Sequence, residues 1–117
     1  MNYNVVVMAK NPLGEFEQIV LLAILRLKDV AYGVSIRVEI RACTRRLVTP
    51  GALYTTLDRL ERKGMVSSRE GDPTAERGGR AKRFYAVTKR GKAQLKDAQK
   101  AYQRLMAGLE LLGGQNG

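Results

Sequence analysis

The stretch that decides the fold reads Thr49-Pro50-Gly51-Ala52-Leu53-Tyr54-Thr55-Thr56-Leu57-Asp58-Arg59-Leu60-Glu61-Arg62-Lys63-Gly64. Threonine is a preferred helix N-cap, proline suits the first helical position, and glycine is typical of the point where a helix stops. Leu53, Leu57 and Leu60 are spaced by four and then three residues, which predicts one inward face. The stretch therefore predicts a short amphipathic helix that is bracketed at both ends.

The other face of this predicted helix is polar and small at its leading end. We expect it to present Ala52, Thr55, Thr56, Arg59, Arg62 and Lys63. Gly51 and Ala52 would let the backbone approach DNA closely, as in a recognition helix whose N-terminal turn enters the major groove. Thr55 and Arg59 follow one turn later, where side chains could reach base edges.

A basic hairpin is predicted directly after this helix. Two short β-prone segments between Met65 and Val87 flank a run of turn-forming residues from Gly71 to Arg80. In the return strand, alternation sends Tyr85 and Val87 toward the core. A helix followed at once by such a hairpin is typical of a winged helix-turn-helix. The cations predicted to contact DNA from this wing are Arg77, Arg80, Lys82 and Arg83.

Two more helices are predicted upstream, after an arm formed by residues 1–12. Apolar residues cover almost every side of the first, from Leu13 to Leu27, so we expect it to be buried, partly by a second subunit. The second runs from Tyr32-Gly33 to about Arg45. Its inward positions are predicted to be Val34, Val38, Ile40 and Cys43, with Arg37, Arg41, Arg45 and Arg46 outward near phosphates.

The last predicted helix is expected to join two subunits. Thr88 can cap it, and it extends from Lys89 to Leu112 before Gly113-Gly114 ends it. Packing on the chain's own first helix is the alternative, but the predicted helix is long enough to overhang a small domain. The predicted dimerisation residues are a heptad seam and one residue of the first helix: Leu95, Ala98, Tyr102, Leu105, Leu109, Leu112 and Phe16. The domains are thus 1–12 (arm), 13–88 (winged helix-turn-helix), 89–112 (dimerisation helix) and 113–117 (tail).

Composition limits the partners and the chemistry. In 117 residues, enough for one small domain, 21 Lys and Arg against 11 Asp and Glu give a formal charge of +10, which favours a polyanionic partner. Seven basic residues and no acid lie between Arg77 and Lys92. Cys43 is the only cysteine and histidine is absent, so we predict no disulfide within the chain, no metal site and no cofactor. Cys43 is expected to be a small buried side chain in a cytoplasmic protein without a membrane span.

From Leu13 to about Leu95 the sequence resembles the PadR family of bacterial transcriptional regulators. Four motifs carry the resemblance, in the family's order: Tyr32-Gly33-Val34-Ser35-Ile36, Thr49 to Leu60, Lys63-Gly64-Met65-Val66, and Gly78 to Gly91. The resemblance implies a homodimeric winged helix-turn-helix repressor that binds a palindromic operator and is released by a small ligand or a stress signal. It also implies DNA contacts at Thr49, Gly51, Tyr54, Thr55, Gly79, Arg80 and Lys82.

The chain departs from the family pattern in its recognition helix and in its length, since with a single C-terminal helix it resembles the short members, which dimerise through that helix. The family commonly has proline directly after the Leu-Tyr pair, where this chain has Thr55. Some short members bind flat aromatic compounds between tryptophans at the dimer interface, and this chain has no tryptophan. The operator and the effector therefore do not carry over from the resemblance.

Two other classes of function stay open at this point. A basic RNA-binding or ribosome-associated winged-helix module is the main alternative, although a two-fold dimer matches palindromic DNA better than irregular RNA. An enzyme is not predicted, because the sequence has no histidine, no phosphate-binding glycine loop ending in Lys-Thr or Lys-Ser, and no convergent set of carboxylates.

Overall fold

Helices and one β-hairpin form the part of the chain that the structure, a computed structural model, describes: residues 13–71 and 82–109. The helical segments are α2 (Glu15–Leu27), the 3₁₀ turn η1 (Lys28–Val30), α3 (Gly33–Thr44), α4 (Pro50–Arg62) and α5 (Lys89–Met106), and the strands are β1 (Val66–Glu70) and β2 (Arg83–Val87). The predicted fold class, mainly α with a small β-hairpin, is confirmed. The predicted arm lies outside the described residues.

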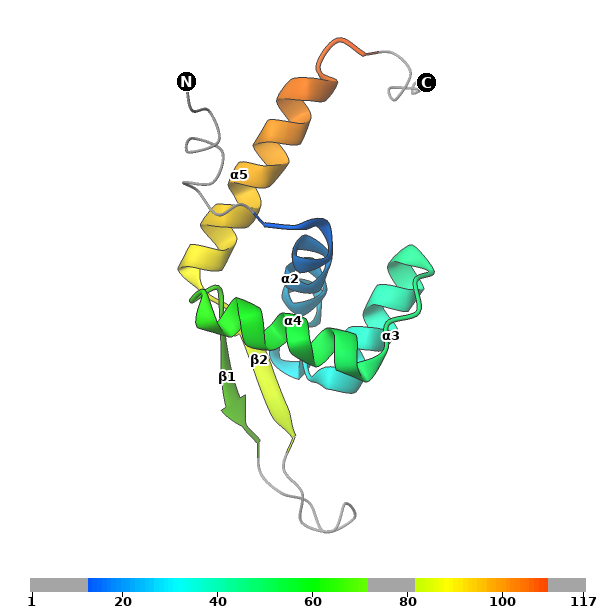
Figure 1. The fold of residues 1–117 in the computed structure, drawn as a ribbon, viewed down its shortest axis with the longest axis vertical. Helices are drawn as coiled ribbons and strands as arrows, with labels where there is room; N and C mark the ends of the chain where they lie inside the picture. The colour runs from blue at the N-terminus through cyan, green and yellow to red at the C-terminus, as the bar shows by residue number, and fades with distance from the viewer. Residues whose placement is uncertain (1–12, 72–81, 110–117) are drawn as a thin grey trace.

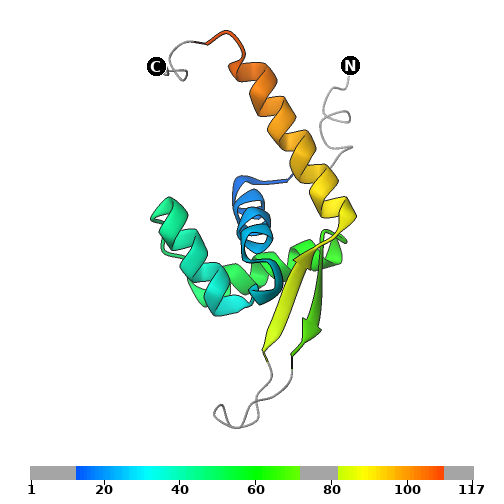
Figure 2. The ribbon, with the colours of Figure 1, turned by 180° about the vertical axis from the view of Figure 1, so that it is seen from behind.

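The elements are arranged around α2. Figure 1 shows α4 crossing α2, α3 on one side, the hairpin projecting downward and α5 leading upward away from the other helices. The opposite view in Figure 2 shows the same arrangement from behind. The core lies where α2, α3 and α4 meet. Its largest fully buried side chains are Val20, Leu21, Ile24, Ile36, Ile40, Leu53, Leu57, Leu60 and Met65.

The predicted caps are present at α4 and α5. The Thr49 hydroxyl accepts a hydrogen bond from the Ala52 N–H at 3.1 Å, and the Thr88 hydroxyl accepts one from the Gly91 N–H at 3.1 Å. Gly64, with φ of +78°, follows α4 in the left-handed region that favours glycine. The N-cap at Thr49 and the stop at Gly64, both predicted from the sequence, therefore set the length of α4.

The predicted inward face of α3 was largely wrong. Val34 and Val38 are 55% and 61% exposed, and Cys43 is exposed, whereas Ile36 and Ile40 are buried. The stripe that faces α2 and α4 passes through Gly33, Ile36 and Ile40, so the valines lie on the opposite side of the helix. Cys43 is exposed because the last turn of α3, residues 41–44, lies entirely outside the core.

The predicted length of the last helix was also wrong. α5 ends at Met106, because Ala107 leaves the helical backbone with a ψ of 129°, and Gly108 follows with a φ of +82° in the left-handed region. Leu112 lies outside the described residues. Of the helices that the structure describes, none combines the length and the apolar character needed to cross a membrane.

Candidate nucleic-acid interface

The leading half of α4 is exposed on one side and anchored on the other. Leu53 and Leu57 are fully buried, while Gly51, Ala52, Tyr54 and Thr55 are exposed. A Cβ built at Gly51 would meet no atom within 4 Å, so the backbone surface there is open. The Thr49 cap and Pro50 fix the first turn, so the exposed residues are held on a rigid element.

Tyr54 packs against the start of α3. A Cβ at Gly33 would lie 2.0 Å from the Tyr54 hydroxyl oxygen and 2.8 Å from its Cζ, so a larger residue at the start of α3 would require the Tyr54 ring to move. Tyr54 nevertheless remains 45% exposed. The contact links two of the sequence motifs: the glycine of Tyr32-Gly33 makes room for the tyrosine of Leu53-Tyr54.

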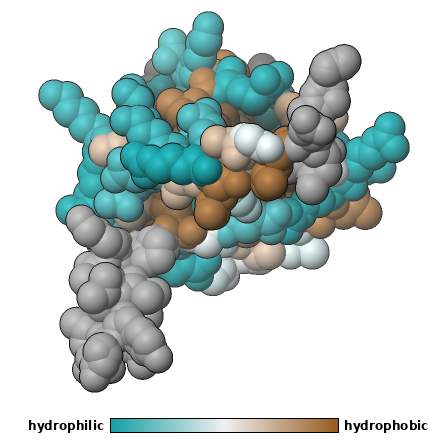
Figure 3. All heavy atoms as spheres, turned by 90° about the horizontal axis from the view of Figure 1, so that it is seen from above, coloured by the Kyte–Doolittle hydropathy of each residue, from teal (hydrophilic) through white to brown (hydrophobic). Residues whose placement is uncertain are grey.

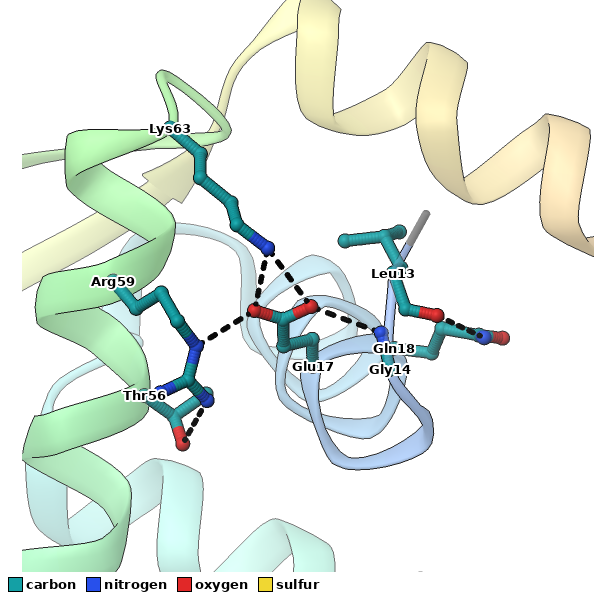
Figure 4. Close-up of polar contacts among 7 residues, drawn as sticks. All are labelled: Leu13, Gly14, Glu17, Gln18, Thr56, Arg59 and Lys63. Atoms are coloured by element: carbon teal, nitrogen blue, oxygen red, sulfur yellow. Dashed lines mark hydrogen bonds and ion pairs between the residues drawn. The ribbon is translucent and has the colours of Figure 1, made fainter. Parts of the chain in front are cut away.

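The second half of α4 differs from the predicted outer face. Thr56 is only 4% exposed, because it faces α2. Arg59 Nε lies 2.9 Å from Glu17 Oε2, and Lys63 Nζ lies 3.0 Å from the same oxygen. Figure 4 shows both cations turned toward the carboxylate of Glu17 on α2. Arg62 is exposed, so it is the cation of this half that faces solvent.

Glu17 is the functional candidate that sequence reasoning missed. It is 5% exposed, in the first turn of α2. Burial raises the pKa of its carboxyl, but the Gly14 N–H, Arg59 and Lys63 outweigh burial, so the pKa lies below the ordinary value. A signal was present in the sequence: Glu17 occupies the buried stripe of α2 together with Val20, Leu21 and Ile24.

The hairpin is paired in register and tied to the segment before α3. β1 and β2 are antiparallel, with Val66 opposite Val87 and Glu70 opposite Arg83. The Tyr85 N–H donates to the Ala31 carbonyl at 2.9 Å, and Tyr85 is 6% exposed, which confirms its predicted inward position. The base of the hairpin is therefore fixed to the helical core rather than attached through its ends alone.

Aromatic rings and cations alternate toward the end of the paired strands that lies away from the core. The rings of Tyr32 and Phe84 have centroids 5.6 Å apart. Lys82 Nζ lies 4.2 Å from the Tyr32 ring centroid, and Arg69 Cζ lies 4.8 Å from that of Phe84. Arg83 donates to Ser68 Oγ at 3.0 Å and lies 3.6 Å from Glu70. The predicted wing residues Arg77, Gly79 and Arg80 lie outside the described residues.

The arginines of the α3 region have separate partners. Arg37 Nε donates to the Val48 carbonyl at 2.8 Å, which holds the connection between α3 and α4. Arg46 lies 3.3 Å from Glu15 and 5.8 Å from the Phe16 ring centroid. Arg41 and Arg45 are exposed, as predicted. This surface adds positive charge next to the leading turn of α4.

Comparison with known proteins agrees with this arrangement of α4 and the hairpin. Residues 21–97 match the family described as Transcriptional regulator PadR-like family. The chain belongs to the PadR-like family. Its helix α4 and hairpin occupy the positions of the recognition helix and the wing in the winged-helix DNA-binding fold.

Relatives of this PadR-like chain include sequences and solved structures. It is 41% identical over 69 residues to transcriptional regulator Rv3488 of Mycobacterium tuberculosis, and the match covers 59% of each chain. A PadR-like transcription factor from Bacteroides fragilis is 25% identical with a TM-score of 0.67, and the match covers 87% of this chain and 91% of that one. A PadR family transcription regulator from hypervirulent Clostridium difficile is 30% identical with a TM-score of 0.60, and the match covers 78% and 90% of the two chains.

The predicted dimerisation residues of this PadR-like chain fall into two groups. Leu95, 5% exposed, belongs to the core of its own chain, and Ala98 and Phe16 are half-buried. Tyr102, Leu105 and Leu109 are 61%, 75% and 48% exposed, although Leu109 lies beyond the end of α5. Leu95 thus packs within its own chain, while Tyr102, Leu105 and Leu109 extend into solvent in the described chain.

Proposed function

We propose that this chain is a homodimeric repressor that binds a palindromic operator in duplex DNA and is released by a small-molecule effector or a stress signal. The observation that carries this proposal is the open leading turn of α4, where Gly51, Ala52 and Thr55 are exposed. The cations Lys82 and Arg83 stand at the start of β2 in the adjoining hairpin. A rigid, small-residue helix end beside basic side chains suits base contact from the helix and phosphate contact from the wing.

The division of labour follows from side-chain chemistry. Ala52 and Thr55 carry a methyl group and a hydroxyl, which can contact the thymine methyl and hydrogen-bond to base edges. Lys82 and Arg83, with Arg77 and Arg80 of the wing, bring charge to phosphates and contribute to binding on any sequence. Thr49, Gly51, Tyr54 and Gly79 complete the proposed DNA surface, with Arg62 as its cation from α4, because Arg59 and Lys63 are paired with Glu17.

A binding experiment tests this division. Fluorescence anisotropy across a salt series would compare a duplex selected by the protein from a random-sequence library, a scrambled duplex and a structured RNA. We expect the selected duplex to remain bound at salt concentrations that release the other two. Lys82→Ala should weaken both duplexes and reduce the salt slope by about one, and Thr55→Ala should weaken only the selected duplex. Equal binding of the RNA and the selected duplex would contradict the proposal.

A matched control separates a specific contact from a change in total charge. Lys100 is exposed on α5, away from the hairpin. Lys100→Ala removes the same charge as Lys82→Ala, so it should leave the salt slope close to that of the wild type. If both substitutions reduce the slope equally, the wing has no special role in phosphate contact.

Exposed apolar side chains support the proposed dimer. On α5, Leu105 is 75% exposed, and on α2, Leu22 and Leu25 are 39% and 36% exposed. Between α2 and α3 lies a groove of about 370 Å³, lined by residues that include Ile19, Leu22, Ala23 and Ile40. Figure 3 shows hydrophobic side chains gathered in the middle of the face seen from above, with hydrophilic ones around them. Such a surface is typical of an interface.

In this proposal residues 13–88 bind DNA and α5 joins the two subunits, with the second copy covering these apolar side chains. At about 1.5 Å per residue, the 18 residues of α5 extend roughly 27 Å, enough to reach across a neighbouring subunit. Leu105→Glu should convert the dimer to a monomer in sedimentation equilibrium. Gln103→Glu, which adds the same charge on the same exposed helix, should leave the dimer intact. A monomeric wild-type protein would contradict the proposed dimer and favour the RNA-binding alternative.

A reporter assay in living cells tests repression, because the proposed DNA target lies in the cytoplasm. A reporter whose promoter overlaps the selected duplex sequence should fall in expression when the protein is present. Higher reporter expression would identify an activator instead. A compound that lowers the affinity for the selected duplex without unfolding the protein would qualify as the effector.

A further inference from the structure

The carboxylate of Glu17 holds two cations of α4. It accepts hydrogen bonds from the Gly14 N–H at 2.9 Å, from Arg59 Nε at 2.9 Å, and from Lys63 Nζ at 3.0 and 3.3 Å (Figure 4). The side chains of Glu17 and Lys63 are 7% and 19% exposed, so this contact is largely removed from water. Charge-assisted hydrogen bonds in such a setting are strong and directional.

The arrangement of Arg59 is fixed on both sides. Its Nε is bound by Glu17, and one terminal nitrogen lies 3.4 Å from Oγ1 of Thr56, which is 4% exposed. The Arg59 side chain as a whole is 43% exposed, so it would be free to turn outward if Glu17 did not hold it. Glu17 therefore determines whether this guanidinium faces α2 or solvent.

A buried negative charge next to a DNA-binding helix calls for an explanation. By Coulomb's law an acid near DNA weakens binding on every sequence. If Arg59 and Lys63 contacted phosphates instead, they would strengthen binding to DNA of any sequence, without distinguishing one base pair from another. Holding those cations against Glu17 favours selectivity over total affinity.

Resting on the proposed DNA binding, we propose that Glu17 determines specificity by positioning Arg59 and Lys63 against α2. The recognition helix then presents Gly51, Ala52 and Thr55 to the bases, and its two bound cations stay away from the phosphates. The same contacts join the first turn of α2 to the last turn and the C-cap of α4, so they help to position the two helices relative to each other.

The proposal predicts opposite effects on the two kinds of DNA. In Glu17→Gln, Arg59 and Lys63 become free to contact phosphates. Binding to a random-sequence duplex should strengthen several-fold at low salt, and its salt slope should steepen by about one to two. Binding to the selected duplex should gain less or fall, because α4 is less firmly positioned. The ratio of the two affinities should therefore drop about ten-fold.

The matched control is Glu61→Gln. Glu61 is an exposed acid on α4 whose Oε2 accepts a hydrogen bond from Ser68 Oγ at 2.8 Å. This substitution removes the same charge but releases neither Arg59 nor Lys63. It should change the salt slope by much less than Glu17→Gln, and the ratio of affinities should stay close to that of the wild type.

Arg59→Ala supplies a readout that does not depend on the stability of Glu17→Gln. In the wild-type background it should leave the random-duplex salt slope unchanged, because the guanidinium is already held by Glu17. In the Glu17→Gln background it should remove about half of the gain in slope. Circular dichroism at the assay temperature confirms that each variant is folded before binding is compared.

The outcomes separate this proposal from the proposed function. A wild-type protein that binds selected and random duplexes equally would overturn the proposed function before any variant is tested. If the wild type is selective but Glu17→Gln weakens both duplexes equally with an unchanged slope, Glu17 is only structural. If Arg59→Ala lowers the slope by about one in the wild-type background, Arg59 contacts phosphates and the proposal is also wrong.

Discussion

Gly91, in the first turn of α5, leaves no room for a side chain. A Cβ at this position would lie 2.3 Å from the Met65 carbonyl oxygen and 2.8 Å from Val87 Cγ1. The Met65 carbonyl also accepts the Thr88 N–H at 3.0 Å, so it is held at the junction of β2 and α5. We predict that Gly91→Ala forces α5 away from the hairpin and destabilises the protein.

The size of the effect follows from two opposing contributions. Adding a methyl group to a packed site costs about 1–3 kcal/mol, and the upper end applies because the obstructing oxygen belongs to the backbone. Replacing glycine by alanine inside a helix stabilises the folded state by about 1 kcal/mol. The net loss in the free energy of unfolding is therefore about 2 kcal/mol. For a domain of this size that corresponds to a fall in Tm of roughly 8–16 °C.

Thermal unfolding followed by circular dichroism, at one protein concentration, measures this loss. Gly51→Ala is the matched control, because a Cβ there would meet no atom within 4 Å. Its Tm should equal or slightly exceed that of the wild type, although its affinity for DNA should fall. A Gly91→Ala protein as stable as Gly51→Ala would refute the close packing of α5 on the strand ends.

Three further predictions concern a cap, a charge and a ring. Thr49→Ala removes the acceptor for the Ala52 N–H and should cost about 1 kcal/mol in urea unfolding; an unchanged midpoint would contradict the cap. Because the pKa of Glu17 is lowered, its stabilising contribution should be complete above the ordinary value of 4.5 and lost as pH falls below it. The stability difference between wild type and Glu17→Gln should shrink in that range, and a difference that is constant with pH would argue against it. Phe84→Ala removes the ring beside Tyr32 and should speed hydrogen exchange at the Tyr85 amide, reflecting a loss of about 1–2 kcal/mol; unchanged exchange would mean that the ring does not hold the hairpin.

Local signals in the sequence were sufficient for much of the fold. The bounds of α4 follow from Thr49, Pro50 and Gly64, and its buried face follows from the leucine spacing, because caps and periodicity act within a few residues. The inward position of Tyr85 follows from strand alternation in the same way. These features need no knowledge of the rest of the chain.

Features that depend on distant packing could not be predicted. Apolar residues occupy Val34, Ile36, Val38 and Ile40 alike, so the sequence does not say which side of α3 meets α2. The Glu17 to Arg59 contact joins residues 42 positions apart, and no local pattern marks it. The heptad spacing continues past Met106, so it does not indicate that the backbone turns at Gly108 and that α5 has ended.

The hydrogen bond from the Gly71 N–H to the Lys82 carbonyl, 2.7 Å long, has a consequence for how such regulators diversify. This bond closes the paired strands at the end away from the core, while the Tyr85 bond to Ala31 ties β2 to the helical domain. The sequence between Gly71 and Lys82 can therefore vary in length and charge at little thermodynamic cost, since lengthening a closed loop adds only a slowly growing entropy term. In the proposed DNA complex, segments of different charge could then be exchanged between these two residues without any change in the sequence of α4.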